Sequence, residues 1–435
     1  MGVGNIIFLI IFIAASLLFT KNLKRIIRNI KLGKDVDRSD NPSLRWKTMA
    51  RVALGQSKMV VRPIAGVLHI LVYVGFVIIN IEVIEIIIDG IFVTYRVLSF
   101  MGGFYNFLIG SFEVLAFLVL VACVILYIRR NFIKIQRFWK PEMKGWPTSD
   151  ANLILIFEVL LMSAFLFMDA ADFLLQERGV FQNAGAFPIS CMLTPMLVDF
   201  SDGTLLLIER FCWWFHIIGI FGFLNYLVVS KHLHILLAFP NTYYSSLKPK
   251  GEFTNMASVT NEVKMMLDPN ADPFAAPTSD SPPERFGAKD VTDLNWVQLM
   301  NAYTCTECGR CTSECPANAT GKKLSPRKIM MDVRDRVEEV GKGIDKNGTG
   351  FSDGKSLLND FITPEELWAC TSCNACTEAC PINIDPLSII IDMRRYLVME
   401  ESAAPTELNM MFTNVENNGA PWQFPAADRL NWKDE

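Results

Sequence analysis

Long apolar stretches alternate with short polar segments along the first half of the chain. Five stretches approach or reach the ~20 residues that a helix needs to cross a hydrocarbon core. They are residues 3–19, 63–88, 104–128, 152–172 and 204–230. The first has no basic residues before it and no small-residue cleavage site after it, so it predicts a retained helix and not a signal peptide. The pattern therefore predicts a bundle of five transmembrane helices.

Lysine and arginine are distributed unevenly over the segments between these stretches. Residues 20–62 contain 12 of them and residues 129–150 contain six, whereas residues 89–103 and 173–203 contain one each. Because basic loops stay on the cytoplasmic side, the N-terminus is predicted to lie outside and everything after the fifth helix in the cytoplasm. We expect a multi-pass protein of the cytoplasmic (inner) membrane.

Composition agrees with a membrane protein and excludes two other classes. Of the 435 residues, 51% are hydrophobic and 20% are charged, whereas disordered chains have few apolar and many charged residues. Lysine and arginine outnumber aspartate and glutamate by 24 to 16 in residues 1–250, but are outnumbered by 29 to 17 in residues 251–435. A nucleic-acid-binding protein concentrates basic charge on its soluble part, whereas the soluble part of this chain is acidic.

Eight of the 11 cysteines form two copies of one pattern, Cys-x2-Cys-x2-Cys-x3-Cys-Pro. In the bacterial cluster-binding run of this spacing, three thiolates bind one cubane and the fourth binds the other. A reducing compartment disfavours disulfides, and zinc sites usually contain paired Cys-x2-Cys motifs, so we predict two [4Fe–4S] clusters. The ligands predicted for the first cluster are Cys305, Cys308, Cys311 and Cys380. Those predicted for the second are Cys370, Cys373, Cys376 and Cys315.

The remaining cysteines, Cys123, Cys191 and Cys212, lie in or near apolar segments and are interpreted as packing residues. Amphipathic stretches follow both cysteine runs, which favours a helical ferredoxin domain over a β-type one. Residues 44–60 are predicted to form an amphipathic helix, either at the membrane interface or in a cytoplasmic loop. The predicted fold is all-α. Its parts are a membrane anchor (1–240), an extended linker with little helix (241–290), a dicluster ferredoxin domain (291–400) and a C-terminal tail (401–435).

Histidine inside a membrane span is costly and usually functional, and this chain has four histidines: His69, His216, His232 and His234. His69 follows Arg62 by seven residues and His234 precedes Pro240 by six, which places both roughly 10 Å deep from the cytoplasmic side. Two imidazoles at matched depth on neighbouring helices can bind one haem iron from opposite faces. We therefore predict one b-type haem between His69 and His234.

His216 precedes His234 by 18 residues, which is five turns, so both are expected on one face of the fifth helix. At ~27 Å from His234, His216 is too far away to share that iron. It is a candidate for a second haem or a quinone site, although Ile79 and Asn80 stand where the opposite ligand would lie. His232 is expected to point elsewhere.

Several acidic residues lie in or beside the apolar stretches. Each could carry protons to or from a quinone, or could instead sit at headgroup level or pair with Arg96 or Arg210. These residues are Glu82, Glu85, Glu113, Glu158, Asp169 and Glu209.

Two families resemble the two halves of the chain. The cysteine half resembles the helical ferredoxin domain of heterodisulfide-reductase-like proteins through Cys-Thr-Glu-Cys-Gly-Arg-Cys-Thr-Ser-Glu-Cys-Pro-Ala (305–317), Thr-Gly-Lys-Lys-Leu-Ser-Pro (320–326) and Cys-Thr-Ser-Cys-Asn-Ala-Cys-Thr-Glu-Ala-Cys-Pro-Ile (370–382). The membrane half resembles the haem b anchor, or gamma subunit, of respiratory nitrate reductase through Ser-Lys-His-Leu-His (230–234) and the 18-residue histidine spacing. The resemblance implies His69 and His234 as one haem pair, with His216 binding a second haem in two-haem members.

Proteins that join such halves resemble membrane-bound, quinone-linked iron–sulfur oxidoreductases, including those that exchange electrons between electron-transfer flavoprotein and menaquinone. The resemblance implies a respiratory electron-transfer protein that connects a cytoplasmic redox partner to the quinone pool through two [4Fe–4S] clusters and haem b. The alternative is a non-catalytic anchor and electron relay of a larger oxidoreductase complex, without its own quinone site. Relatives continue into domains with Cys-Cys-Gly motifs, which we expect here on a separate subunit.

Overall fold

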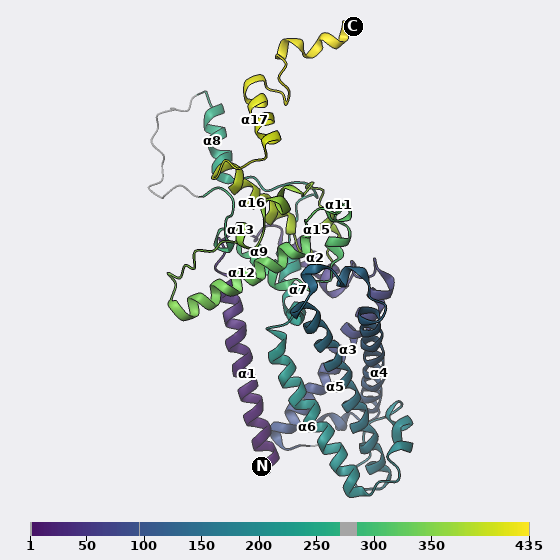
Figure 1. Cartoon of the computed structure of the whole chain (residues 1–435). Coiled ribbons are helices and arrows are strands. Elements are labelled where there is room, and N and C mark those ends of the chain that lie inside the picture. The colour runs from purple at the N-terminus through teal and green to yellow at the C-terminus, as the bar shows by residue number, and fades with distance from the viewer. Residues whose placement is uncertain (1, 95, 270–284, 435) are drawn as a thin grey trace.

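The computed structural model describes residues 2–94, 96–269 and 285–434, and its described elements are all helical. Five long helices form one bundle, and each is long and apolar enough to cross a membrane (Figure 1). They are α1 (Val3–Ile30), α3 (Pro63–Phe92), α4 (Gly103–Asn131), α5 (Trp146–Glu177) and α6 (Asp202–Leu227). The all-α fold with five candidate spans is thus confirmed.

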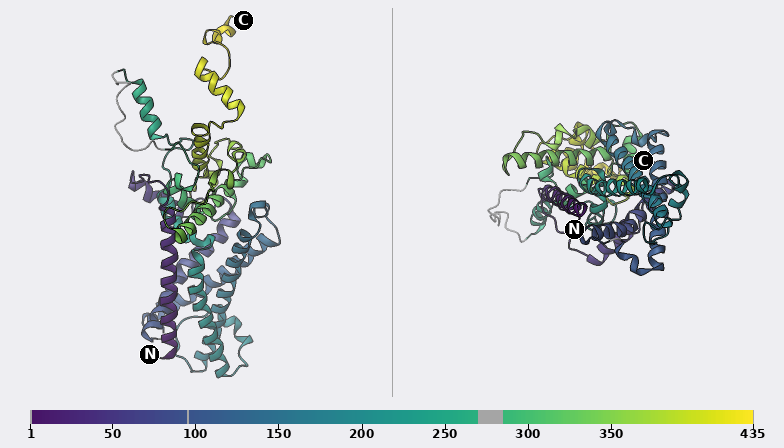
Figure 2. Two further views of the ribbon diagram at one scale, coloured as in Figure 1. Left: turned by 60° about the vertical axis from the view of Figure 1, so that its left-hand side comes forward. Right: turned by 90° about the horizontal axis from the view of Figure 1, so that it is seen from below.

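The five long helices differ in how much of their surface is covered by their neighbours, and α1 is covered least. The two views of Figure 2 show α1 standing at the edge of the bundle, where it packs against α6 and α3. Large apolar side chains such as Ile10, Leu17 and Phe107 are exposed on the bundle surface. A continuous exposed apolar surface of this kind is what lipid contact requires.

α1 continues well beyond its apolar stretch. The stretch ends at residue 19, yet the helix runs to Ile30 through a segment rich in lysine, arginine and isoleucine. Hydropathy identifies only the part of a helix that suits the hydrocarbon core. Lysine and arginine are good helix formers, so the helix can continue through them beyond the membrane. Helices α9 (Trp296–Thr304) and α12 (Pro326–Asn347) of the cysteine-containing half of the chain, the second unit of the molecule, contact this extension of α1.

The fifth span ends earlier than its apolar stretch suggests. α6 stops at Leu227, a single 3₁₀ turn η6 (Lys231–Leu233) follows, and α7 (His234–Tyr243) begins at His234. The Ser230 hydroxyl accepts a hydrogen bond from the His232 backbone N–H at 3.2 Å and so caps the turn. The prediction that His216 and His234 share one face of a continuous helix is therefore wrong.

The second unit consists mainly of short helices and lies at one end of the bundle (Figure 1). Its longest helix, α12, begins at Pro326 after a Ser325 cap, and its buried residues Ile329, Val333 and Val337 recur every four positions, as an amphipathic helix requires. The helices are α9 (Trp296–Thr304), α10 (Arg310–Ser313), α11 (Pro316–Ala319), α12 (Pro326–Asn347), α13 (Leu357–Asp360), α14 (Pro364–Trp368), α15 (Ala375–Ala379) and α16 (Pro386–Met399).

The remaining segments are short. The segment 44–60 contains most of α2 (Pro42–Met49) and a π-helical turn, η1 (Ala50–Leu54). Helix α8 (Ala257–Leu267) lies in the segment predicted to contain little helix, because its alanine, glutamate, lysine and methionine residues favour one. The C-terminal tail contains α17 (Thr406–Asn418) and η8 (Ala426–Lys433). Other 3₁₀ turns are η2 (Val97–Met101), η3 (Gln136–Phe138), η4 (Pro141–Met143), η5 (Ser190–Met196) and η7 (Val291–Asp293).

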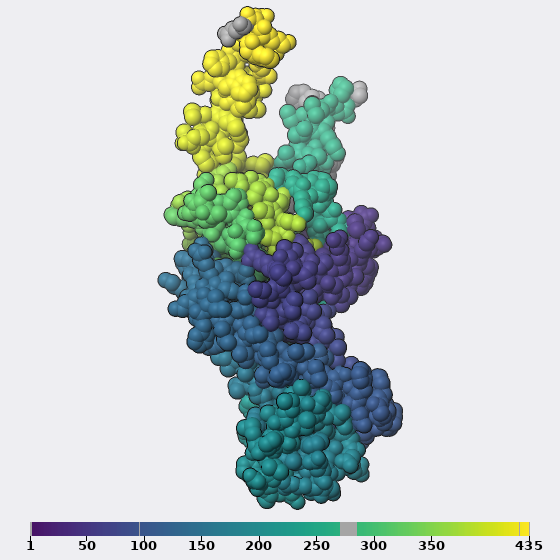
Figure 3. Space-filling view, turned by 90° about the vertical axis from the view of Figure 1, so that its right-hand side faces the viewer, coloured from purple at the N-terminus to yellow at the C-terminus, as the bar shows by residue number. Residues whose placement is uncertain are grey.

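The basic segments of the anchor lie directly beneath the second unit (Figure 3). In segment 20–62, the Asn29 side-chain amide donates to the Tyr303 hydroxyl at 2.8 Å, and Arg62 pairs with Glu314 at 2.9 Å. The fully buried Arg327 is held by segment 129–150, where it pairs with Glu142 at 2.7 Å. The lysines and arginines that predicted orientation thus also lie in the surface on which this unit docks.

Candidate redox sites

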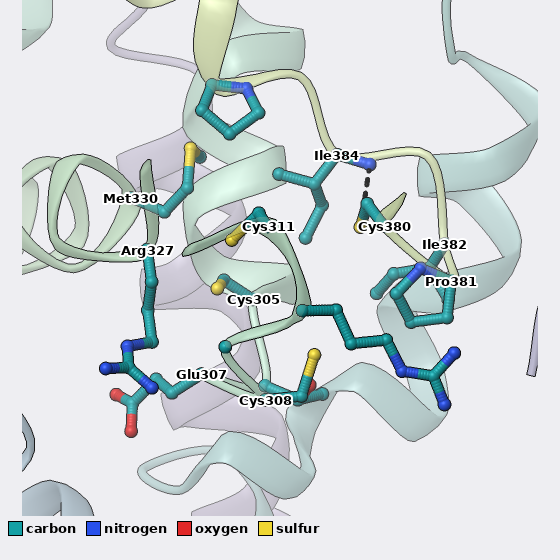
Figure 4. A pocket seen from close by; sticks show the side chains of 14 residues that line it. Cys305, Glu307, Cys308, Cys311, Arg327, Met330, Cys380, Pro381, Ile382 and Ile384 are labelled. Atoms are coloured by element: carbon teal, nitrogen blue, oxygen red, sulfur yellow. Dashed lines mark hydrogen bonds between the residues drawn. The ribbon is translucent and has the colours of Figure 1, made fainter. Parts of the chain in front are cut away.

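Four of the predicted cluster ligands line one pocket, called the cysteine cavity below. Cys305 and Cys308 come from the segment that joins α9 to α10 and Cys311 comes from α10 itself, whereas Cys380 follows α15 (Figure 4). A cubane places one thiolate on each of four irons, so its ligands enclose a volume and do not converge on a point. The donor set, four thiols around one pocket, therefore fits the first predicted cluster.

The two cysteine runs have the same backbone shape. Glu307 and Gly309 in the first run have φ angles of +56° and +71°, and the matching Ser372 and Asn374 in the second have +57° and +60°. Left-handed residues in a short loop turn backbone N–H groups towards an anionic group. Accordingly, the Ser372 N–H donates to the sulfur of Cys370 at 3.4 Å.

The second predicted set also comes together across the two runs. Helices α10 and α15, which each contain the third cysteine of their run, pack against each other. Cys315 and Cys373 both lie close enough to Cys370 to interact with it electrostatically, and Cys376 does so too. Cys373 is exposed, whereas Cys315 and Cys376 are buried, so this set lies nearer the surface of the protein than the first.

Burial changes the acidity of the thiols. It raises the pKa of Cys305 and of Cys376 to about 12 and that of Cys380 to about 11. A buried thiol with such a pKa keeps its proton at neutral pH unless a bound metal takes the place of that proton. These cysteines are therefore suited to hold metal and unsuited to act as free thiolate nucleophiles.

The three remaining cysteines lie apart from both sets. Cys123 in α4 and Cys212 in α6 are buried within the bundle, and Cys191 lies in η5. Cys123 and Cys212 belong to one hydrophobic cluster of the bundle, in agreement with their interpretation as packing residues.

His69 of α3 and His234 at the start of α7 face each other. Their ring centres are 6.3 Å apart, with an angle of 45° between the rings. Two imidazoles that bind one metal ion from opposite sides, at ~2 Å each, place their centres about 6 Å apart. The Nδ1 atom of His234 lies 3.0 Å from the backbone oxygen of Lys231, which favours the tautomer with a free Nε2 lone pair. The buried Nδ1 of His69 has no hydrogen-bond partner among the described residues.

His232 and His216 occupy different surroundings from those predicted. The ring of His232 lies 5.8 Å from that of His234 and edge-on to Phe223, so it does not point away from the histidine pair. Only the break after α6, which no residue periodicity marks, brings it there. His216 is buried against α5, where its Nδ1 lies 3.1 Å from the Leu161 carbonyl oxygen, and the structure does not bring it to another histidine.

Acidic side chains gather in the bundle at the end away from the second unit. Arg96 pairs with Asp172, and the Tyr105 hydroxyl donates to Glu85 at 3.1 Å. Glu209 pairs with the adjacent Arg210 at 2.9 Å. Within the described part of the chain, one buried oxygen in each of three other carboxylates has no hydrogen-bond partner. These carboxylates belong to Glu82, Glu113 and Asp169.

An ion pair joins the cysteine cavity to the turn between α6 and α7, which contains His232 and His234 and is called the histidine corner below. Glu307, which is only 3% exposed, lies between two of the cavity's cysteines and pairs with Lys231 at 2.6 Å and Arg334 at 2.7 Å. Burial would raise the pKa of the Glu307 carboxyl, but the two cations hold it below its usual value. From the same loop, Arg310 donates to the backbone oxygens of Lys58 and Met59 at 3.0 and 3.3 Å.

Comparisons with known proteins agree with this geometry. Residues 304–384 match the protein family described as a 4Fe-4S dicluster domain. The chain is 28% identical to a probable iron-sulfur-binding oxidoreductase, FadF, of Bacillus subtilis, over 99% of its own length and 61% of the relative. It is also 28% identical to the EtfAB:quinone oxidoreductase of Syntrophomonas wolfei, over 92% of its own length and 55% of the relative.

Two further relatives match only part of the chain. A probable membrane-anchored ferredoxin of Chromohalobacter salexigens is 34% identical over 34% of the chain and 24% of the relative. One component of the dihydromethanophenazine:CoB–CoM heterodisulfide reductase of Methanosarcina mazei is 29% identical over 33% of the chain and 35% of the relative. No solved structure matches.

These findings indicate an iron–sulfur membrane protein and are consistent with a role in electron transfer. The chain carries a 4Fe-4S dicluster domain and is similar to heterodisulfide-reductase-like iron–sulfur oxidoreductases. Its five apolar helices and its likeness to a membrane-anchored ferredoxin indicate a membrane protein. It spans 61% and 55% of the lengths of the first two relatives.

Proposed function

We propose that this chain passes electrons between a cytoplasmic redox partner and the quinone pool, menaquinone or another quinone, through two [4Fe–4S] clusters and one b-type haem. The observation that best supports the proposal is that a cysteine site and a histidine site, both with side chains that can bind metal, are in contact within one polypeptide. The Lys231–Glu307 pair, at 2.6 Å, joins the histidine corner to the cysteine cavity. Neither site alone would connect a soluble protein to a lipid-soluble substrate.

The cysteine sets would hold the clusters as the two runs exchange their fourth ligands. Cys305, Cys308 and Cys311 would bind one cluster with Cys380, and the second run would bind the other with Cys315. Bound in this way, the clusters supply one-electron carriers. The backbone N–H of Ile384 donates to the sulfur of Cys380 at 3.3 Å, and hydrogen bonds of this kind help to set the potential of a cluster.

His69 and His234 would hold the haem, with the Lys231 carbonyl orienting the His234 ring. A second haem is not part of the proposal, because the other three histidines lie together around His234 and the ring beside His216 is that of Phe165. In this proposal, the carboxylates of Glu82, Glu113 and Asp169 would exchange protons with a quinone in the bundle, since each has a buried oxygen without a hydrogen-bond partner among the described residues.

For topology, we propose that the N-terminus lies outside and the iron–sulfur domain lies in the cytoplasm of the cell, as the distribution of basic residues favours. Similarity to an EtfAB:quinone oxidoreductase supports electron-transfer flavoprotein as the soluble partner.

The test is the metal and haem content of the purified full chain, followed by its response to quinol. Two [4Fe–4S] clusters and one haem require about eight non-haem irons, as much labile sulfide and one Soret-absorbing group per chain. Addition of menaquinol should then reduce the haem. A chain with full cofactor content and no response to any quinol would instead be an electron relay without a quinone site. A colourless chain would contradict the proposal.

A further inference from the structure

The pair Lys231–Glu307 crosses the boundary between the membrane anchor and the dicluster domain, and both of its side chains are enclosed there. The exposed fractions of the side chains are 10% for Lys231 and 3% for Glu307. A buried ion pair loses the solvation of both charges, so it adds little stability compared with an apolar contact. Its presence at this boundary therefore calls for an explanation other than stability.

On the anchor side, Lys231 is held in one position by several contacts. Its ammonium group donates to the Pro147 carbonyl at 2.7 Å, and its backbone N–H donates to Asp150 at 3.1 Å. Its own carbonyl oxygen lies 3.0 Å from Nδ1 of His234. The ammonium position and the orientation of the His234 ring thus depend on the same residue.

On the other side, Glu307 belongs to the cysteine loop itself. It lies between Cys305 and Cys308 in a left-handed conformation, with φ of +56°. Arg334 of α12 holds the second carboxylate oxygen at 2.7 Å and contacts Asp335 on its own helix. One carboxylate of the cysteine loop therefore carries the charge that pairs with Lys231.

We propose that the Lys231–Glu307 pair orients His234 and couples the reduction potential of the haem to that of the first cluster. Lys231 is the positioning residue for the haem ligand, and Glu307 is the fixed charge that both redox centres share. The inference rests on the haem placed between His69 and His234 under the proposed function. A unit charge within ~10 Å, at an effective dielectric constant of ~20, changes a redox equilibrium by about tenfold.

The experiment is a redox titration of the full chain in detergent, with haem followed by absorbance and the first cluster by electron paramagnetic resonance. Lys231→Met removes a cation, so the ratio of reduced to oxidised form at fixed potential should fall about tenfold for both centres. Glu307→Gln removes an anion and should raise both ratios. Arg334→Gln removes the other cation on the same carboxylate and should also lower both ratios. The matched control, Lys355→Gln, removes an exposed cation paired with Glu339 and should change neither ratio.

Two further readouts separate orientation from charge. The low-spin haem signal should shift in Lys231→Met, whereas Lys231→Arg, which keeps the cation, should restore the haem potential. If Lys231→Met binds no haem, the Glu307→Gln variant tests the inference instead. Lys231 keeps its contacts with Pro147 and Asp150 in that variant, so the haem site should remain intact. Unchanged haem potentials in Lys231→Met and Glu307→Gln would overturn the inference. A wild-type chain without haem would instead overturn the proposed function.

Discussion

The ring centres of His69 and His234 are 6.3 Å apart, although the two residues belong to α3 and α7. The separation matches that of two imidazoles on one metal ion, and His234 is held through its Nδ1 by the Lys231 carbonyl. The break after Leu227 creates this arrangement, because it turns the chain so that α7 begins with the facing histidine.

We predict that His69→Ala and His234→Ala each abolish haem binding. A low-spin b-type haem needs both axial imidazoles, and an alanine leaves an open coordination position. The measurement is the Soret absorbance and the pyridine haemochrome yield per purified chain.

His232→Leu and His216→Ala are the matched controls for this pair. Both remove a histidine from the same region, and both should keep one haem per chain. The His216→Ala chain should lose about 3 kcal/mol of stability, because removal of the buried ring leaves a cavity and breaks the hydrogen bond to Leu161. Haem loss in His232→Leu together with haem retention in His234→Ala would assign the ligand role to His232.

We predict that Cys380→Ser and Cys315→Ser damage different clusters. Cys380 lines the cavity of the first run, so its replacement should remove the signal of the cluster bound by Cys305, Cys308 and Cys311. Cys315→Ser should affect the other cluster. The measurement is iron and sulfide content, with electron paramagnetic resonance of the reduced chain.

Cys212→Ser is the control for the cysteine variants. It lies in the bundle and apart from both sets, so iron and sulfide should stay at the wild-type level. If Cys380→Ser and Cys315→Ser each affected the cluster of their own run, the exchange of fourth ligands would be wrong.

We predict that Ser99→Cys and Ser258→Cys react from opposite sides of the membrane. Both serines are exposed. Ser99 lies in η2, between the second and third spans, and Ser258 lies in α8 after the fifth. In intact cells that carry Cys191→Ser, a membrane-impermeant maleimide should label only Ser99→Cys, and permeabilisation should add Ser258→Cys. The reverse order of labelling would invert the proposed topology.

We predict that Gly309→Ala lowers cluster content and stability. Gly309 has φ of +71°, and an added Cβ would lie 2.6 Å from the Arg327 guanidinium, which is fully buried. The left-handed conformation costs an alanine about 1 kcal/mol, and the displaced Arg327 adds to this. We expect a loss of about 2–3 kcal/mol, measured by thermal unfolding together with iron content.

Gly321→Ala is the control that separates the cost of the left-handed backbone from the cost of the contact with Arg327. Gly321 also has a positive φ, +83°, but an added Cβ would meet open space. It should cost only the ~1 kcal/mol of backbone strain and leave the iron content unchanged. Equal losses in the two variants would show that the contact with Arg327 contributes nothing.

The sequence was sufficient for the features that depend on neighbouring residues. The apolar stretches predicted five spans, because a helix of about twenty apolar residues matches the thickness of the hydrocarbon core. The spacing of the cysteines predicted two matching loops, because three ligands to one cluster must come from a single turn. Both loops indeed have left-handed residues at the same positions, such as Glu307 and Ser372.

Only the tertiary structure decided how distant parts meet. The apolar stretch 204–230 contains no sign that α6 ends at Leu227, because hydropathy measures affinity for lipid and not the course of the backbone. The approach of His232 to His234 and the contact of Lys231 with Glu307 follow from that turn and from the docking of the cysteine unit. Such contacts are determined by packing between segments far apart in the chain, about which local residue patterns carry no information.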